Sequence, residues 1–153
     1  MNIVFKQATM LDIESIILFL QDYVDKDILL FRSEDEIAQS INHYYIGEYS
    51  NKIIACGFLQ IHNKSLCEIR SLLVDEKYRK QGIAKKLISL LIEKAKEMSL
   101  KKIIVLTYVK DVFISLGFIE TDKKEIPSEK IWIDCLRCKF FSKCEEILLI
   151  KNL

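Results

Sequence analysis

The hydrophobic positions of this chain follow two patterns, one with helical and one with strand spacing. The first helical segment, capped by Thr9 or Asp12, has apolar side chains at Ile13, Ile16, Ile17 and Leu20. A second helix is expected after Gly82, with one face made by Ala84, Leu87, Ile88, Leu91, Ala95 and Met98. Shorter helices are expected after Ser33, where Ser-Glu-Asp-Glu has the form of a capping box, and over residues 110–116, ended by Gly117.

Strand patterns cover most of the remaining chain. They predict strands at residues 3–6, 43–50, 53–61, 66–74, 103–106 and 146–151. Turns at Asn51-Lys52 and Asn63-Lys64 would join three of them into an antiparallel meander. The helix after Gly82 would then lead to a parallel strand, and a long polar loop is expected after Phe118. This order predicts one α/β domain over residues 1–153 with a sheet of mixed direction.

The charge and the hydrophobic composition of the chain argue against two classes of binding partner, nucleic acids and membranes. Half of the residues are hydrophobic and the formal net charge is +1, so the chain lacks a field that would attract nucleic acid or an anionic membrane. No apolar run approaches the roughly 20 residues that a bilayer span needs, and the N-terminal residues do not have the pattern of a signal peptide. We therefore expect no nucleic-acid or membrane partner, and a cytoplasmic protein with reduced cysteines.

Residues 72–84 carry the strongest chemical signal, because an apolar strand runs through a basic turn directly into a helix. The first N–H groups of a helix lack intrahelical partners, and the helix dipole adds partial positive charge. Gly82 lets an anion approach the backbone closely, while Arg79 and Lys80 supply full charges. The segment predicts a pyrophosphate site; the alternative is an ordinary β-α-β crossover with a solvated basic turn.

The pattern Arg-x-x-Gly-x-Ala in this turn resembles the acetyl-CoA loop of the GNAT superfamily of N-acetyltransferases, and the resemblance extends over most of the chain. It implies a single-domain GNAT fold, a mixed and mostly antiparallel sheet with helices on both faces. It also implies acetyl-CoA as co-substrate, bound by Leu72, Leu73, Val74, Arg79, Lys80, Gln81, Gly82, Ile83, Ala84 and Lys85. If the sheet opens beside residues 72–74, backbone groups there could pair with the pantetheine amides, and the N–H of Leu73 could point at the oxyanion.

Acetyl transfer to an amine also needs a base, because an α-ammonium must lose a proton before it attacks. Glu68 is the candidate, acting directly or through one water. On a regular strand Glu68, Arg70 and Leu72 would face one side. The alternative is that Glu68 is a solvated partner of Arg70.

The general acid is left open between several groups. Many GNAT enzymes place a tyrosine four residues before the Gly-Phe pair, where this chain has Phe113, which we expect to pack against the cofactor arm. Thr107 matches a serine of the N-acetylglutamate synthases, and Tyr108 is adjacent. Either hydroxyl, or water, could protonate the leaving thiolate.

Two separate segments of the chain resemble one particular group within the GNAT superfamily. Residues 29–33, Leu-Leu-Phe-Arg-Ser, and residues 67–72, Cys-Glu-Ile-Arg-Ser-Leu, resemble the acetyltransferase domain of N-acetylglutamate synthases. The tail over residues 126–138, with Cys-Glu-Glu at 144–146, resembles the short bacterial members that lack an amino-acid-kinase domain.

This narrower resemblance implies L-glutamate as the acceptor, and therefore the first step of arginine biosynthesis. Arg32 would bind one carboxylate, Lys130 is a weaker candidate for the other, and backbone near Leu30 and Ser71 would orient the amine. The alternatives are another amino acid, a polyamine or a protein N-terminus as acceptor, and, from another class, a non-catalytic acyl-CoA-binding or metal-linked interaction module. A homodimer is compatible with all of them.

The cysteines suggest two further hypotheses. Cys135, Cys138 and Cys144 are as close in sequence as zinc ligands, but three ligands fall short of the four in a structural site. We therefore expect reduced thiols that pack a loop, and no metal. Cys67 beside Glu68 suggests an acyl-cysteine intermediate, but direct transfer in a ternary complex is the expectation for this family.

Overall fold

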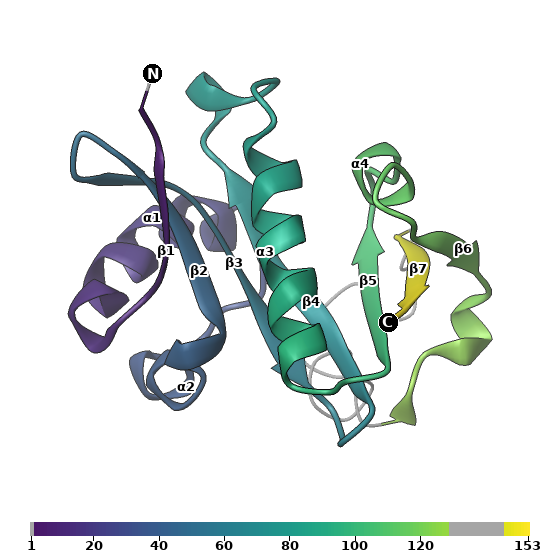
Figure 1. The fold of residues 1–153 in the computed structure, drawn as a ribbon. Coiled ribbons are helices and arrows are strands. Elements are labelled where there is room, and N and C mark those ends of the chain that lie inside the picture. Colours follow the sequence, from purple (N-terminus) through teal and green to yellow (C-terminus); the bar gives the residue numbers. More distant parts are fainter. Residues whose placement is uncertain (1, 129–145) are drawn as a thin grey trace.

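A single mixed sheet forms the centre of the molecule (Figure 1). The computed structural model describes residues 2–128 and 146–153. Within them the strand order is β1-β2-β3-β4-β5-β7-β6. The bounds are β1 Val4–Gln7, β2 Tyr44–Tyr49, β3 Lys52–Ile61, β4 Leu66–Val74, β5 Lys102–Thr107, β6 Ile119–Thr121 and β7 Ile147–Asn152. Strands β4 and β5 pair in parallel and the other described pairs are antiparallel, which confirms the predicted sheet.

Helices cover both faces of this sheet, as expected (Figure 1). The bounds are α1 Ile13–Asp25, α2 Glu34–Gln39, α3 Ile83–Glu97 and α4 Asp111–Ile114. Short 3-10 helices, η1 Met10–Asp12, η2 Ile41–His43, η3 Glu76–Tyr78 and η4 Lys123–Glu125, complete the described elements. None of these described helices combines the length and the apolar character that a membrane span requires.

The alternation of side chains on β3 divides the core into two sides. Phe58 packs with Ile16 of α1 and Ile37 of α2, whereas the next residue, Leu59, packs with Leu91 of α3. Successive strand residues point to opposite faces, so α1 and α2 lie on one face and α3 on the other. Burial of β3 from both sides makes the centre of the sheet a rigid support for residues on β4.

A capping box fixes the start of α2. The Ser33 hydroxyl accepts a hydrogen bond from the Glu36 N–H at 3.1 Å, and the Glu36 carboxylate accepts one from the Ser33 N–H at 3.2 Å. The predicted cap is therefore confirmed. Because Arg32 directly precedes this cap, the box also sets the backbone direction of the segment that carries Arg32.

Three expectations need correction. Residues 119–121 form strand β6, which pairs with β7, instead of belonging to a polar loop. The β2–β3 turn lies at Ser50 and Asn51, whose φ angles are +51° and +61°, one residue earlier than expected. On α3 the buried face includes Ile83 and Ile92, whereas Ala84 is half-buried and Met98, beyond the helix end, is exposed.

Candidate active site

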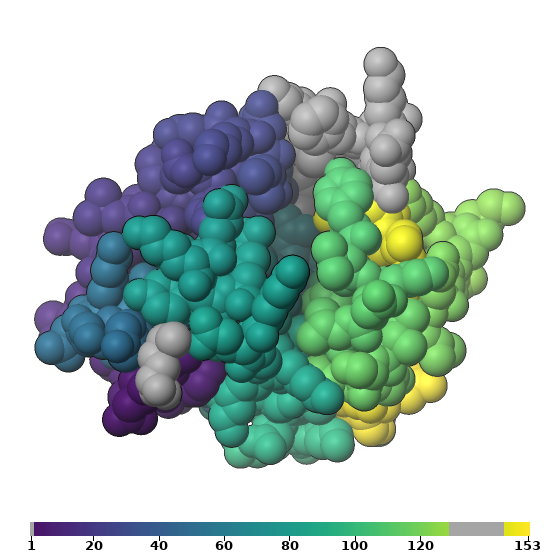
Figure 2. Space-filling model, turned by 90° about the horizontal axis from the view of Figure 1, so that it is seen from above, coloured from purple at the N-terminus to yellow at the C-terminus, as the bar shows by residue number. Residues whose placement is uncertain are grey.

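Strands β4 and β5 separate at the centre of the sheet. Their pairing covers only Leu66–Glu68 opposite residues 102–104, although β4 continues to Val74 and β5 to Thr107. Figure 1 shows the two strands diverging, and Figure 2, seen from above, shows a hollow between the teal atoms of α3 with its preceding loop and the green atoms that follow β5. The sheet therefore opens beside residues 72–74, which meets the condition for pairing with the pantetheine amides, and it presents an edge of β4 to which an extended ligand can add.

A β-bulge lies on β4 at this opening. The β3–β4 register passes from Phe58 opposite Arg70 to Cys56 opposite Leu73, so that Ser71 and Leu72 together face Gly57. Ser71 has a φ of +51°, the left-handed region that a serine rarely adopts.

This bulge reverses the alternation of side chains. A Cβ atom on Gly57 would lie 3.0 Å from Leu72 and 3.4 Å from Leu91 of α3, so Leu72 lies on the α3 face. Leu73 packs instead with the α1 and α2 core. The prediction that Leu72 shares a face with Glu68 and Arg70 is therefore wrong, because β4 is not a regular strand.

The turn before α3 has the properties of an anion site. Lys80 and Gly82 have φ angles of +63° and +78°, and no atom lies within 4 Å of a Cβ built on Gly82. In the described part of the chain, the N–H groups of residues 80–85 have no backbone acceptor, and the first turn of α3 contains no acidic residue. Arg79 partly anchors the turn, since its Nε donates to the Val74 carbonyl at 3.1 Å. These features suit the pyrophosphate of acetyl-CoA.

Glu68 is fully buried and is held by two side chains. Its Oε1 lies 2.9 Å from Nε2 of His62, and its Oε2 lies 3.4 Å from Nη1 of Arg70. The alternative interpretation is therefore correct in pairing Glu68 with Arg70, but wrong in expecting a solvated carboxylate. Sequence reasoning missed His62 as a neighbour of Glu68. The tight turn at residues 63–65 was the available signal, because it places the end of β3 beside the start of β4.

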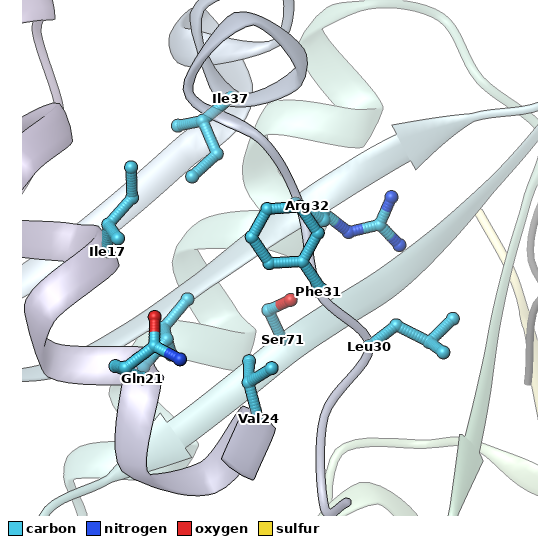
Figure 3. A pocket seen from close by; sticks show the side chains of 9 residues that line it. Ile17, Gln21, Val24, Leu30, Phe31, Arg32, Ile37 and Ser71 are labelled. Atoms are coloured by element: carbon cyan, nitrogen blue, oxygen red, sulfur yellow. The ribbon is translucent and has the colours of Figure 1, made fainter.

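Three of the predicted acceptor residues lie together. Leu30, Arg32 and Ser71 line one pocket, whose other walls come from α1 and α2 (Figure 3). Figure 3 shows the guanidinium of Arg32 extending over the sheet, away from Ile17 of α1.

Aromatic stacking positions Arg32. Its guanidinium carbon lies 5.0 Å from the ring centroid of Phe58, and that ring stacks on Tyr44 with centroids 4.3 Å apart. Burial raises the pKa of Tyr44, which keeps its hydroxyl protonated. Since Phe58 is the cross-strand neighbour of Arg70, the cations Arg32 and Arg70 lie on the same face of the sheet as Glu68.

The two hydroxyl groups that are candidates for the general acid differ in solvent exposure and in hydrogen bonding. The Thr107 hydroxyl donates to the Val109 carbonyl at 3.2 Å and accepts from the Val109 N–H at 3.1 Å, so it belongs to a local turn. Tyr108, the next residue, is 67% exposed. Phe113 is a core residue instead of a surface for the cofactor arm: it is 2% exposed, and its ring packs edge-on against Phe118.

The buried thiols do not favour a covalent intermediate. Burial raises the pKa of both Cys56 and Cys67 to about 12. Cys67 packs with the α3 core, on the face opposite Glu68. A protonated, enclosed thiol is a poor nucleophile, which supports direct transfer. Lys130, Cys135, Cys138 and Cys144 lie outside the described residues, and the residues that the structure does describe contain no group of three side chains suited to a metal ion.

An opened sheet, an anion-binding turn and a buried carboxylate define an acyl-CoA-dependent acetyltransferase. In agreement, the model of the acetyltransferase (GNAT) family matches residues 10–121, so the chain belongs to this family and is an acetyl-CoA-dependent N-acetyltransferase. An uncharacterized N-acetyltransferase of Chlorobaculum tepidum is 32% identical over 97% of this chain and 95% of its own length. An amino-acid acetyltransferase of Mycobacterium tuberculosis is 26% identical over 82% of this chain and 74% of its own length.

A solved structure supports the fold. The N-acetylglutamate synthase of Neisseria gonorrhoeae, complexed with coenzyme A and N-acetyl-glutamate, superposes with a TM-score of 0.80 at 22% identity. The match covers 100% of this chain but only 35% of the synthase, so this chain corresponds to about a third of that protein.

Proposed function

We propose that this enzyme transfers the acetyl group of acetyl-CoA to the α-amine of L-glutamate. The observation that carries the proposal is the common location of Arg32, Leu30 and Ser71 in one pocket, on the same face of the sheet as Glu68. A guanidinium at the acceptor site favours an acceptor with a carboxylate and disfavours a polyamine, whose charge it would repel.

The residues divide the reaction between them. Glu68 removes a proton from the α-ammonium, through one water because the carboxylate is enclosed. The neutral amine attacks the thioester carbonyl, and the N–H of Leu73 is our candidate donor to the oxyanion. Collapse of the tetrahedral intermediate breaks the C–S bond, the former amine nitrogen releases its second proton to solvent, and the thiolate takes a proton from Tyr108, Thr107 or water. Of the two side-chain hydroxyls proposed as the general acid, that of Tyr108 is the more accessible.

The comparisons support an amino acid as acceptor. The Mycobacterium tuberculosis relative is named an amino-acid acetyltransferase, and the Neisseria gonorrhoeae structure contains N-acetyl-glutamate. Arginine biosynthesis is the corresponding proposed pathway. Lys130 remains our candidate for the second carboxylate, and a cytoplasmic location remains a prediction from the sequence.

A panel of acceptor amines tests this proposal. Release of coenzyme A thiol would be measured with L-glutamate, L-glutamine, α-aminobutyrate, a diamine and a short peptide. We expect the highest kcat/KM for glutamate and a large loss for α-aminobutyrate, which lacks the side-chain carboxylate. If a diamine or α-aminobutyrate is used as well as glutamate, the acceptor is wrong, although the enzyme is still an N-acetyltransferase.

A further inference from the structure

His62 and Glu68 form a closed pair in the interior. The His62 Nε2 to Glu68 Oε1 distance is 2.9 Å, and both side chains have 0% exposure. His62 follows the end of β3, and its backbone N–H donates to the Leu66 carbonyl, which fixes it across from the start of β4. The pair is thus held by the hairpin itself and does not depend on a flexible surface side chain.

The surroundings of His62 define its tautomer. Nε2 faces a carboxylate oxygen, so it must carry a proton, since two lone pairs would repel each other. The other ring nitrogen, Nδ1, is buried and has no hydrogen-bond partner in the described part of the chain. The geometry therefore favours a ring that donates from Nε2 to the carboxylate.

We propose that His62 is a positioning residue for the general base. Its Nε2–H holds Oε1 of Glu68 and so fixes the plane of the carboxylate against the acceptor. This inference rests on the proposed role of Glu68.

Among residues 2–128 and 146–153, the other groups around Glu68 make longer contacts to its carboxylate or none that is recorded. Arg70 approaches the second oxygen at the longer distance of 3.4 Å. Gln60, the cross-strand neighbour of Glu68, turns its amide to the Ile61 carbonyl, and Ile104, opposite Glu68 on β5, is apolar. Within the described residues, His62 therefore makes the shortest recorded contact to the carboxylate.

The test compares three replacements of His62. His62→Leu removes the donor and should lower kcat about 10- to 100-fold, the range for loss of a hydrogen bond to a charged group, while KM for acetyl-CoA stays within about 2-fold. His62→Gln, whose amide nitrogen can reach the position of Nε2, should restore most of kcat. His62→Asn, whose amide is one methylene shorter, should not. His43→Leu is the matched control, because His43 is half-buried in η2, outside the site.

A double-mutant cycle with Glu68→Gln separates positioning from a general structural role. If His62 acts through Glu68, His62→Leu should change kcat less than about 3-fold in the Glu68→Gln background. Equal losses in both backgrounds, or a fully active His62→Leu enzyme, would overturn the inference and leave the glutamate proposal intact. A fully active Glu68→Gln enzyme would instead refute the base assignment, and the inference about His62 with it. If His62→Leu does not fold, the Gln and Asn pair carries the same test.

Discussion

A replacement at Gly82 should change the binding of acetyl-CoA at the predicted anion site while leaving the fold intact. Gly82 is the N-cap of α3 with a φ of +78°, and a Cβ at this position meets no atom within 4 Å. Asn and Asp both tolerate the left-handed conformation and have nearly the same shape. The pair Gly82→Asp and Gly82→Asn therefore differs chiefly by one negative charge next to the expected pyrophosphate.

Coulomb's law gives the expected magnitude. A unit charge at about 5 Å from one phosphate charge is repelled by about 1 kcal/mol in water and about 3 kcal/mol at an effective dielectric constant of 20. The Kd for acetyl-CoA should therefore be roughly 5- to 200-fold higher for Asp than for Asn. The difference should shrink in 1 M salt, because the exposed turn is screened.

Isothermal titration calorimetry with acetyl-CoA measures this difference directly, and thermal unfolding of both variants checks the fold. Equal Kd values for the Asp and Asn variants at low salt, both close to the Kd of the parent enzyme, would refute the placement of the pyrophosphate at this turn. Weak binding by both variants with intact folding would show that backbone geometry at Gly82, and not charge, is decisive.

Two further predictions concern the acceptor side. Glu68→Gln should lower kcat by roughly 10²- to 10⁴-fold with little change in the Kd for acetyl-CoA. Its rate should recover partly at high pH, where free amine is abundant, and a pH profile of kcat measures this recovery. A rate equal to that of the parent at neutral pH would contradict the prediction. Arg32→Ala should raise KM for glutamate about 10- to 100-fold and KM for acetyl-CoA much less. Arg32→Lys should rescue only in part, because lysine lacks the planar fork, and Arg32→Met, which keeps the packing on Phe58, should behave like Ala. Steady-state kinetics in both substrates distinguish these outcomes.

Much of the fold could be predicted because its elements depend on local signals. The capping box at Ser33 and Glu36, the helical spacing of α3 and the left-handed Gly117 each act within a few residues. Strand β6 could not be predicted in this way. It has only three residues, and its partner β7 begins at Ile147, far beyond the reach of a local pattern, so its stability comes from a pairing that the local sequence does not encode.

The site was predictable in its chemistry but less so in its geometry. Residue types identified Glu68 and the turn at Gly82 as candidates, and the resemblance of residues 29–33 to the N-acetylglutamate synthases added Arg32. The burial of Glu68 and its contact with His62 depend on how the β3–β4 hairpin closes, which a strand pattern does not specify. Phe113 was assigned from its place relative to Gly117, but a large aromatic ring gains more by packing in the core with Phe118.

The bulge at Ser71 explains how one strand can serve two substrates. Before the bulge, Glu68 and Arg70 point to the face where Arg32 lies on Phe58. The pairing of β4 with β5 ends at Glu68, before the bulge, so the edge of β4 at residues 72–74 is open. A regular strand would place Leu72 on the same face as Glu68 and Arg70. In the proposed reaction, the unusual φ of Ser71 therefore moves Leu72 to the α3 face, which leaves the face of Glu68 and Arg70 for the amine and the open edge of β4 for the thioester.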